Sequence, residues 1–483
     1  MSRLVAVSNR VADPREKAAA GGLAVGVLRA LEKGGGVWFG WNGELITGDP
    51  GEAKVQRRHG VTYATIAIDK ALFESYYNGF CNTTLWPLFH YRLGLSEYYR
   101  AQFDGYVGVS DLFAAKLLPL LKEDDLVWVH DFHLIPLGER LRAAGATQPL
   151  GFFLHTPFPP YDVLRALPVH ERLLRDLCNY DVVGFQTERD LNAFRDAVTQ
   201  PGVGAVMQPD GSLHFDGRIL YAMVFPIGID VEACAKRAGA RESSRWIENL
   251  RASLAGRRLM IGVDRLDYSK GLSRRFEAYQ ALLEQHPEFR REVVFMQVAA
   301  PTRSGVQAYT EIRHELERLA GHINGTFAEV DWVPLRYLNR AIDRGALMSI
   351  FRLARVGLVT PFRDGMNLVA KEYVAAQDPD DPGVLVLSTM AGAAEELREA
   401  VLVNPVDVDA IVEGIQRALT MSRDERRVRH AAMLEVLRKN DIDAWRNRFV
   451  AALRAAAGVP LQEPRPVAAP SGRGREDQRA GAR

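Results

Sequence analysis

The stretch VGLVTPFRDGMNLVAKEYVAAQ, residues 356–377, decides the fold. Its first four residues are apolar and include two valines, which is typical of a buried strand. Pro361 ends this strand, and Asp364-Gly365 is expected to form a turn that tolerates a positive φ. From about Asn367 onward the apolar residues recur at helical spacing. The stretch therefore predicts a strand, a glycine turn and a helix, in that order.

Such an arrangement directs the free backbone N–H groups at the start of the helix towards the space above the sheet, where they can bind an anion. Two carboxylates flank this position: Asp364 in the loop and Glu372 about one turn into the helix. Because carboxylates repel phosphate and accept hydrogen bonds from sugar hydroxyls, the stretch favours a nucleotide-sugar. An ordinary strand–helix connection with solvated charges has the same local pattern, so this stretch alone leaves both interpretations open.

Composition narrows the class of protein. A chain of 483 residues that is 47% hydrophobic predicts two or three domains with ample core. With 61 basic and 60 acidic residues, the net charge of +1 argues against a nucleic-acid partner. Cys81, Cys178 and Cys234 lack metal-ligand spacing and indicate a reducing compartment. No apolar run has the length of a signal peptide or a membrane span, so we expect a cytoplasmic protein that is not in the membrane.

Polar residues follow one apolar strand after another in the first half of the chain. The alternation of apolar strands with helices predicts a parallel α/β sheet, in which ligands bind beyond the carboxyl ends of the strands. Arg10, Asp131 and His155 each occupy such a position, and this repetition carries the prediction. His130 and His133 beside Asp131 suggest a metal, but no further ligand cluster accompanies them, so we expect none.

Glycines and aromatic residues add to this edge of the sheet. Gly21-Gly22 lets the backbone approach a ligand closely, although a flexible loop has the same composition. Tyr76-Tyr77 and Trp86 are expected in loops, and Trp41 in a strand. Aromatic rings are more often core residues, but beside a polar cleft they also bind the apolar faces of sugars.

In the second half, strand–helix alternation restarts after a Pro/Gly break at residues 223–230, where we place the domain boundary. The strand at 259–263 is followed by Arg265 and Lys270, two cations that can neutralise a diphosphate, although surface cations are often only solubilising. Arg303 follows the next strand. Trp445 and Phe449 share one face of the last predicted helix and need a packing partner.

Taken together, these stretches resemble the trehalose-6-phosphate synthase family, retaining glycosyltransferases of the GT-B fold with two Rossmann-like domains that face a central cleft. The resemblance covers residues 1–458. It implies an acceptor domain at 1–225 that is completed by a helix at 441–458, and a nucleotide-sugar domain at 226–440. The tail at 459–483 is rich in Pro, Gly, Ala and Arg with hardly any large apolar residues, so we expect it to be disordered. The motifs that carry it are Ser8-Asn9-Arg10, Gly21-Gly22-Leu23, Trp38-Phe39-Gly40-Trp41, Leu85-Trp86-Pro87, His130-Asp131, and the segments 265–271 and 363–373.

The resemblance implies transfer of glucose from UDP-glucose to glucose 6-phosphate with retention, without a metal or other cofactor. Arg265, Lys270, Asp131 and His155 are then the catalytic residues. The implied donor-binding residues are Gly21, Gly22, Ile342, Asp364, Gly365, Met366, Asn367, Leu368, Val369 and Glu372, with Ile342 by the uracil and Glu372 at the ribose. The implied acceptor-binding residues are Arg10, Trp41, Tyr77, Trp86, Asp131 and Arg303.

Two departures from the family pattern leave the acceptor more open than the donor. Arg303 is followed by Ser304 rather than an acidic residue, and Thr156 stands where an aliphatic residue is common. The alternatives are transfer to glycerol 3-phosphate, a GDP- or ADP-linked donor, a covalent route through Asp131, and a non-catalytic sugar-phosphate sensor. We expect a separate phosphatase to take the product, because no phosphatase motif follows. The sequence leaves open whether the chain forms a homo-oligomer.

Overall fold

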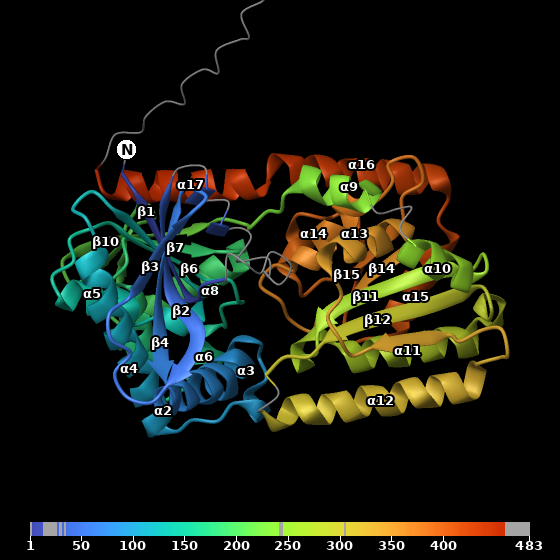
Figure 1. Ribbon diagram of the computed structural model, residues 1–483, viewed down its shortest axis with the longest axis horizontal. Helices are drawn as coiled ribbons and strands as arrows, with labels where there is room; N and C mark the ends of the chain where they lie inside the picture. Colours follow the sequence, from blue (N-terminus) through green and yellow to red (C-terminus); the bar gives the residue numbers. More distant parts are fainter. Residues whose placement is uncertain are drawn as a thin grey trace, which may run out of the picture.

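The computed structural model describes residues 2–12, 27–28, 31–32, 35–240, 245–303 and 306–458. In these residues the chain forms two sheets, one in each half, which lie side by side (Figure 1). The strand order is β3-β4-β2-β1-β5-β6-β7-β10-β9-β8 in the first sheet and β13-β12-β11-β14-β15-β16 in the second. The predicted α/β fold with two Rossmann-like halves is confirmed.

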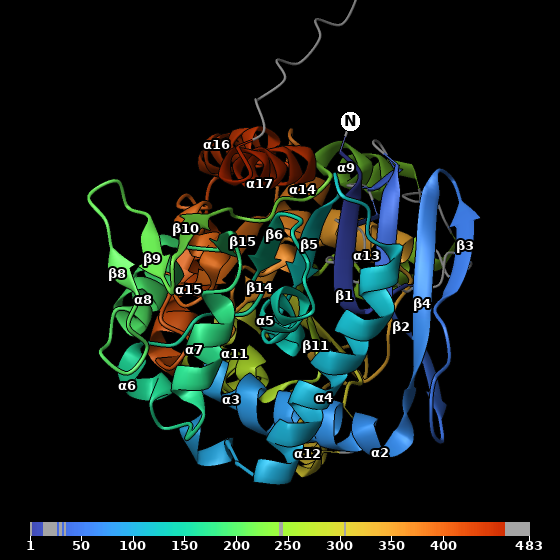
Figure 2. The same ribbon diagram turned by 90° about the vertical axis from the view of Figure 1, so that its left-hand side faces the viewer.

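The first sheet has a parallel centre and antiparallel edges. β1 pairs in parallel with β2 and β5, whereas β3 and the β8–β9–β10 ribbon form the antiparallel edges, on opposite sides of Figure 2. The strands are β1 (Leu4–Arg10), β2 (Gly36–Ile46), β3 (Lys54–Arg58), β4 (Val61–Asp69), β5 (Leu126–His130), β6 (Leu150–Phe153), β7 (Val182–Phe185), β8 (Val206–Met207), β9 (Leu213–Phe215) and β10 (Arg218–Val224). The helices are α2 (Lys70–Phe73), the π-helix η1 (Glu74–Leu85), α3 (Trp86–Phe89), α4 (Arg100–Leu117), α5 (Leu137–Ala143), α6 (Tyr161–Leu164), α7 (His170–Leu177) and α8 (Glu188–Val198).

The second sheet is parallel throughout. Its strands are β11 (Arg258–Arg265), β12 (Val293–Ala300), β13 (Leu335–Leu338), β14 (Val356–Val359), β15 (Val384–Ser388) and β16 (Val401–Val403). The helices are α9 (Val231–Ala240), α10 (Arg245–Leu254), α11 (Leu272–Gln285), α12 (Gln307–Phe327), α13 (Arg344–Leu353), α14 (Leu368–Ala376), α15 (Val408–Thr420), α16 (Arg423–Lys439) and α17 (Ile442–Ala456). Since β11 lies between β12 and β14, the strand order reverses at β11–β14, and ligands bind at such a switch point.

The last helix, α17, packs on the first sheet although it follows the second half in sequence (Figure 1). The ring of Phe449 stacks on Trp128 at a centroid distance of 4.5 Å, and Trp445 lies 4.7 Å from the same ring. Gly151 and Gly184 make room for Phe449, since a Cβ atom would lie 2.7 Å and 2.9 Å from its ring atoms. This packing accounts for the apolar face of the helix.

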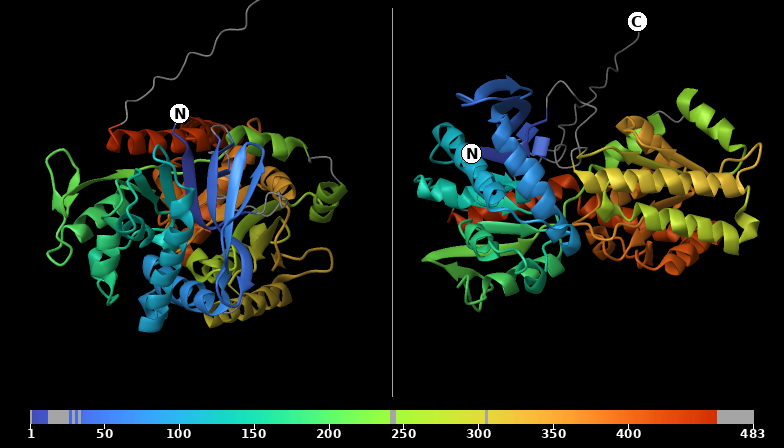
Figure 3. Two further views of the ribbon diagram at one scale, coloured as in Figure 1. Left: turned by 60° about the vertical axis from the view of Figure 1, so that its left-hand side comes forward. Right: turned by 90° about the horizontal axis from the view of Figure 1, so that it is seen from below.

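The chain crosses twice between the halves, and the two crossings are bonded to each other. The N–H of Ile442 donates to the carbonyl of Ile229 over 3.2 Å. The ammonium of Lys371, on α14, donates to the carbonyl of Ile227 over 2.7 Å and pairs with Glu396. Figure 3 shows the two halves side by side, with α11 and α12 on one face of the second half.

The predicted loops around Tyr76-Tyr77 and Trp86 are wrong, because both segments are helical. They belong to the π-helix η1 and to the α-helix α3. π-helical turns are often found at functional sites. Tyr76 stacks on Tyr106 of α4 at 6.1 Å, a contact between elements that the local sequence does not indicate. In the described part of the chain, every helix is too short or too polar to span a bilayer.

Candidate active site

The loops that follow β11 and β14 are packed together at the switch point. Gly271 has a φ of 66°, and a Cβ atom there would collide with the carbonyl oxygen of Thr360, so the position needs glycine for two reasons. The N–H of Phe362 donates to the carbonyl of Ser269 over 2.8 Å. The two loops therefore form one unit.

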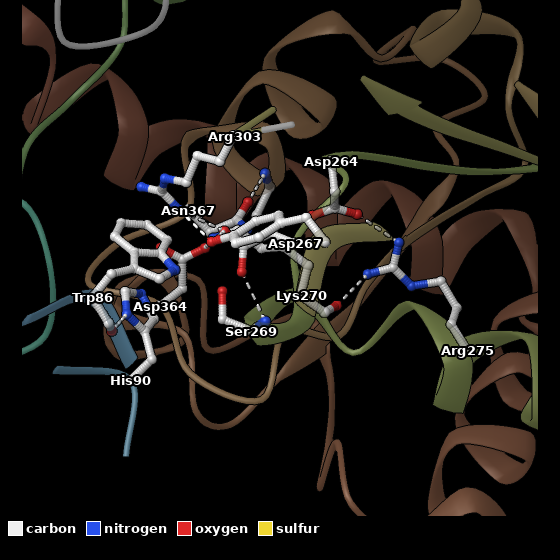
Figure 4. A network of polar contacts seen from close by, with 12 residues as sticks. Trp86, His90, Asp264, Asp267, Ser269, Lys270, Arg275, Arg303, Asp364 and Asn367 are labelled. Carbon is white, nitrogen blue, oxygen red and sulfur yellow. Dashed lines mark hydrogen bonds and ion pairs between the residues drawn. The ribbon is translucent and has the colours of Figure 1, made fainter. Parts of the chain in front are cut away.

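A buried arginine, Arg275, donates hydrogen bonds to both loops (Figure 4). The side chain of Arg275 is fully buried. It donates to Asp264 over 2.7 Å, to Gln297 over 2.8 Å and to the hydroxyl of Thr360 over 3.1 Å. It also donates to the carbonyl of Lys270 over 3.3 Å. Because a buried guanidinium needs all these partners, the positions of both loops are fixed from within the core.

The predicted diphosphate ligand Lys270 is joined to the predicted donor ligand Asp364. Lys270 Nζ lies 2.6 Å from Asp364 Oδ2, which also accepts a bond from Asn367 over 3.1 Å. Burial acts to raise the pKa of Asp364, but Lys270 outweighs it and the pKa is lowered. Asn367 caps α14 by accepting from the N–H of Ala370. The N–H groups before Ala370 have no partner within the helix and remain for a ligand.

The turn before α14 differs from the predicted one. The positive φ, 82°, is at Asn367 and not in Asp364-Gly365. Gly365 is needed for close approach, because a Cβ atom there would collide with the carbonyl oxygen of His155 in the first half. The loop between β14 and α14, residues 360–367, carries predicted donor ligands, and we call it the donor loop. It abuts the end of β6, so predicted residues from both halves meet.

Trp86 of the first half meets two cations of the second half. The guanidinium carbon of Arg303 lies 3.8 Å from the ring centroid of Trp86, and that of Arg265 lies 5.4 Å from it. Arg303 also pairs with Asp267 over 3.0 Å. Burial acts to raise the pKa of Asp267, but Arg303 and Lys270 hold it well below its usual range. Arg303, Arg265 and Lys270 therefore place three cations here, and two carboxylates with lowered pKa values, Asp267 and Asp364, pair with Arg303 and Lys270.

Three of the acceptor residues predicted in the first half, Arg10, Trp41 and Tyr77, lie along a row of aromatic rings. The Arg10 guanidinium lies 5.5 Å from the ring of Trp41, and Trp41 lies 4.9 Å from Phe73. Phe73 stacks on Tyr77 at 5.0 Å, and Tyr77 stacks on His133 at 5.8 Å. Arg10, Trp41 and Tyr77 are therefore brought together by rings that the sequence did not single out for binding.

Asp131 has a strained backbone at the end of β5. Its φ of 74° and ψ of 163° fall in a region that is nearly restricted to glycine, and such strain gathers at functional sites. One carboxylate oxygen accepts from the N–H of His155 over 3.3 Å, and the other lies 3.8 Å from His133 Nδ1. Burial raises the pKa of Asp131 to about 6, against the lowering effect of Arg265 and Arg303.

His155 is kept neutral in the site. Its Nε2 lies 3.2 Å from His130 Nδ1, so one ring donates and the other accepts. Burial lowers the pKa of His155 to about 3. The pKa of His130 is lowered mainly by burial and to a smaller extent by the neighbouring His155. A neutral imidazole at the end of β6 can exchange hydrogen bonds with a sugar hydroxyl without adding charge.

Glu372 and Ile342 are linked through a residue that the sequence did not indicate. Arg344, two positions after Ile342, donates to the Glu372 carboxylate. Burial raises the pKa of Glu372, and Arg344 opposes this effect. Ile342, Leu368 and Val369 are partly buried against the core, and Met366 is buried.

Two predicted site residues are not described by the structure, and several residues that support the site have no pattern in the local sequence. Gly21 and Gly22 are not among the described residues. Arg275, Arg344 and His133 act through contacts between distant elements, so no local pattern indicates their role. Asp267 follows β11 and stands in the same strand-end position as the predicted residues.

Comparison with known proteins agrees with this geometry. The model of glycosyltransferase family 20 matches residues 5–455. The chain belongs to glycosyltransferase family 20. The match covers both halves of the chain and all the described residues of the candidate site.

Three relatives within family 20 are similar over nearly their whole length. The trehalose-6-phosphate synthase of Escherichia coli (strain K12) is 50% identical over 456 residues, 94% of this chain and 95% of the relative. The structure of an alpha,alpha-trehalose-phosphate synthase (UDP-forming) from Burkholderia vietnamiensis has a TM-score of 0.92 and 50% identity, covering 95% and 98% of the two chains. The Burkholderia xenovorans enzyme in complex with glucose-6-phosphate has a TM-score of 0.91 and 49% identity, covering 94% and 100%.

Proposed function

We propose that this glycosyltransferase transfers glucose from UDP-glucose to glucose 6-phosphate, forming α,α-1,1-linked trehalose 6-phosphate and UDP. The observation that carries the proposal is the convergence of Lys270, Asp364 and the start of α14 on the switch point of the second sheet, against His155 of the first half. The UDP-forming relative and the relative that binds glucose 6-phosphate support the choice of substrates.

The donor occupies the second half in this proposal. Arg265, Lys270 and the N–H groups of α14 bind the diphosphate, and Asp364 binds the donor glucose. Glu372 accepts from the ribose hydroxyls, with the uracil near Ile342. The fixed Lys270–Asp364 pair and the Glu372–Arg344 pair support this assignment, because both hold a charged group in place before a ligand arrives.

The acceptor lies against the first half, with its phosphate towards Arg10 and towards Arg303 of the second half. Trp86 and Tyr77 pack against the sugar ring, and Asp131 accepts from a hydroxyl. The support is the cationic stack of Arg303 on Trp86 and the row of rings that contains Arg10 and Tyr77.

The transfer proceeds with retention. The acceptor hydroxyl oxygen attacks C1 of glucose on the face from which UDP departs, as the bond between C1 and the phosphate oxygen breaks. The acceptor proton passes to the departing phosphate oxygen, so no nucleophile from the chain is needed. Negative charge grows on the diphosphate, and Arg265, Lys270 and the α14 N-terminus stabilise it without rearranging.

The proposal is tested with UDP-, GDP- and ADP-glucose, each combined with glucose 6-phosphate or glycerol 3-phosphate. We expect the highest kcat/KM for UDP-glucose with glucose 6-phosphate, one UDP released per product, and an α,α-linked product by NMR. Preference for another pair would identify a sibling transferase. Sugar-phosphate binding without transfer would identify a sensor.

The proposal includes the organisation of the chain. Residues 1–225 with 441–458 form the acceptor domain, and 226–440 form the donor domain, which agrees with α17 packing on the first sheet. Because the product is a phosphate monoester, a separate phosphatase is the class of enzyme that consumes it. The chain acts in trehalose biosynthesis.

A further inference from the structure

A second contact between the halves lies beside the donor loop. Arg363, directly before Asp364, donates to the hydroxyl of Tyr91 over 3.0 Å, and its guanidinium carbon lies 4.6 Å from the Tyr91 ring centroid. The same guanidinium lies 3.5 Å from Asp190 Oδ1. The side chains of Arg363 and Asp190 are only 6% and 3% exposed, so this charged contact is shielded from water.

The first half holds its side of the contact without help from Arg363. Asp190 accepts from the hydroxyl of Thr187 over 2.6 Å and from the N–H of Phe158 over 3.1 Å. The Tyr91 hydroxyl donates to the carbonyl of Phe158 over 3.3 Å. Tyr91 has a φ of 60°, which is uncommon for a residue with a side chain. The Asp190 carboxylate and the Tyr91 ring and hydroxyl are therefore held by contacts within the first half, and together they form the binding site for the Arg363 guanidinium.

The second half holds its side through the donor loop. Asp364 pairs with Lys270, and Gly365 abuts the carbonyl of His155. Arg363 is covalently part of this loop, so its position reports the position of Asp364 relative to the first half. If the halves separate, the Arg363 contact must break, and if it forms, Gly365 must approach His155.

We propose that Arg363 is an interdomain latch, a positioning residue whose contacts with Tyr91 and Asp190 hold the donor loop against the first half and set how readily the two half-sites meet. The latch rests on the proposed function only in that donor and acceptor bind on opposite halves. A ligand that contacts both halves binds with its intrinsic affinity when every molecule has the halves together. When only a fraction of the molecules has this arrangement, the apparent Kd rises by the inverse of that fraction.

The chain provides a matched control in the same interface. Arg189 and Glu395 also join the halves, at 3.4 Å, but their side chains are 42% and 40% exposed. Exposed ion pairs contribute little, whereas hydrogen bonds to buried charges contribute more. A latch effect should therefore follow Arg363 and not Arg189.

The test compares Arg363→Met, Tyr91→Phe and the control Glu395→Gln. It measures the Kd for UDP by calorimetry, kcat and KM for both substrates, and the radius of gyration in solution with and without UDP. We expect Arg363→Met to raise KM for glucose 6-phosphate, whose proposed ligands lie on both halves, about tenfold or more, with smaller changes in kcat and in the Kd for UDP, and to enlarge the UDP-free particle. Tyr91→Phe should have a smaller effect in the same direction, and Glu395→Gln should stay within about twofold.

The latch is overturned if Arg363→Met and Tyr91→Phe keep the wild-type KM for glucose 6-phosphate and leave the radius of gyration unchanged. It is also overturned if Glu395→Gln has an effect as large as Arg363→Met. Should Arg363→Met fail to fold, Tyr91→Phe, which removes one oxygen atom, decides the outcome. If the wild type binds UDP but transfers no glucose, the proposed function fails, while the radius of gyration still tests the latch.

Discussion

The ammonium of Lys270 lies 2.6 Å from the carboxylate of Asp364, although 94 residues separate them in the chain. The pair joins the loop after β11 to the loop after β14. Its side chains are 9% and 17% exposed, so both charges are largely desolvated, and each depends on the other. A cation that is fixed in this way can stabilise a departing diphosphate without reorganising, which is the main source of catalytic power in such sites.

Arg265 tests the role of positive charge in the transfer step. Arg265→Ala is expected to lower kcat by about 10²–10³, because it removes one fixed contact to charge that grows in the transition state. Arg274→Ala is the control, since Arg274 is half-exposed on α11 and pairs with Glu277. Steady-state kinetics with both substrates give the values. Near-normal turnover of Arg265→Ala would refute its role at the diphosphate.

Trp86 tests whether the aromatic platform supports the acceptor site. Its ring faces the guanidinium groups of Arg303 and Arg265 from the other half. Trp86→Leu should raise KM for glucose 6-phosphate by about three- to thirtyfold, and Trp86→Phe should have a smaller effect, because phenylalanine retains part of the cation–π attraction. The exposed Trp246, changed to leucine, serves as the control. Equal KM values for the leucine and phenylalanine variants of Trp86 would contradict the platform.

Asp131 predicts a distinct pH dependence. Burial raises its pKa to about 6, so the carboxylate that accepts from the acceptor hydroxyl is lost as the pH falls through that value. Glucose 6-phosphate takes up its own proton near pH 6. On a log–log plot, kcat/KM for glucose 6-phosphate should therefore fall with a slope near two for the wild type and near one for Asp131→Asn, in which only the substrate titrates. Identical slopes would show that Asp131 does not titrate in the reaction.

Chelation tests the expected independence from metal. Arg265, Lys270 and the start of α14 provide the positive charge that Mg²⁺ provides in many phosphate-transfer sites. We expect full turnover after exhaustive EDTA treatment, measured with metal-free substrates. Loss of turnover that Mg²⁺ restores would overturn this prediction.

The sequence predicted the positions at strand ends well, because the parallel sheet imposes them. Asp131 and His155 follow buried strands of the first sheet and Asp364 follows one of the second, and each parallel sheet brings the ends of its strands to one edge whatever their partners are. The contact Lys270–Asp364 follows from this geometry, because β11 and β14 are neighbours. A rule about chain order was sufficient for these residues.

The sequence could not predict features that depend on packing between elements. Tyr76-Tyr77 is expected in a loop, yet the segment is helical and Tyr76 stacks on Tyr106 of α4. The positive φ belongs to Asn367, and Gly365 is needed instead for its close approach to the His155 carbonyl. The partners Arg344 and Arg363 were also missed, because an arginine that reaches another element leaves no local pattern.

A crystal structure of the full chain with UDP and glucose 6-phosphate tests the central claim most directly. We predict the diphosphate within hydrogen-bonding distance of Lys270 and Arg265, the ribose at Glu372, and the acceptor phosphate at Arg303 in the cleft between the halves. A nucleotide bound away from Lys270 and Glu372 would contradict the assignment of the site and the mechanism derived from it.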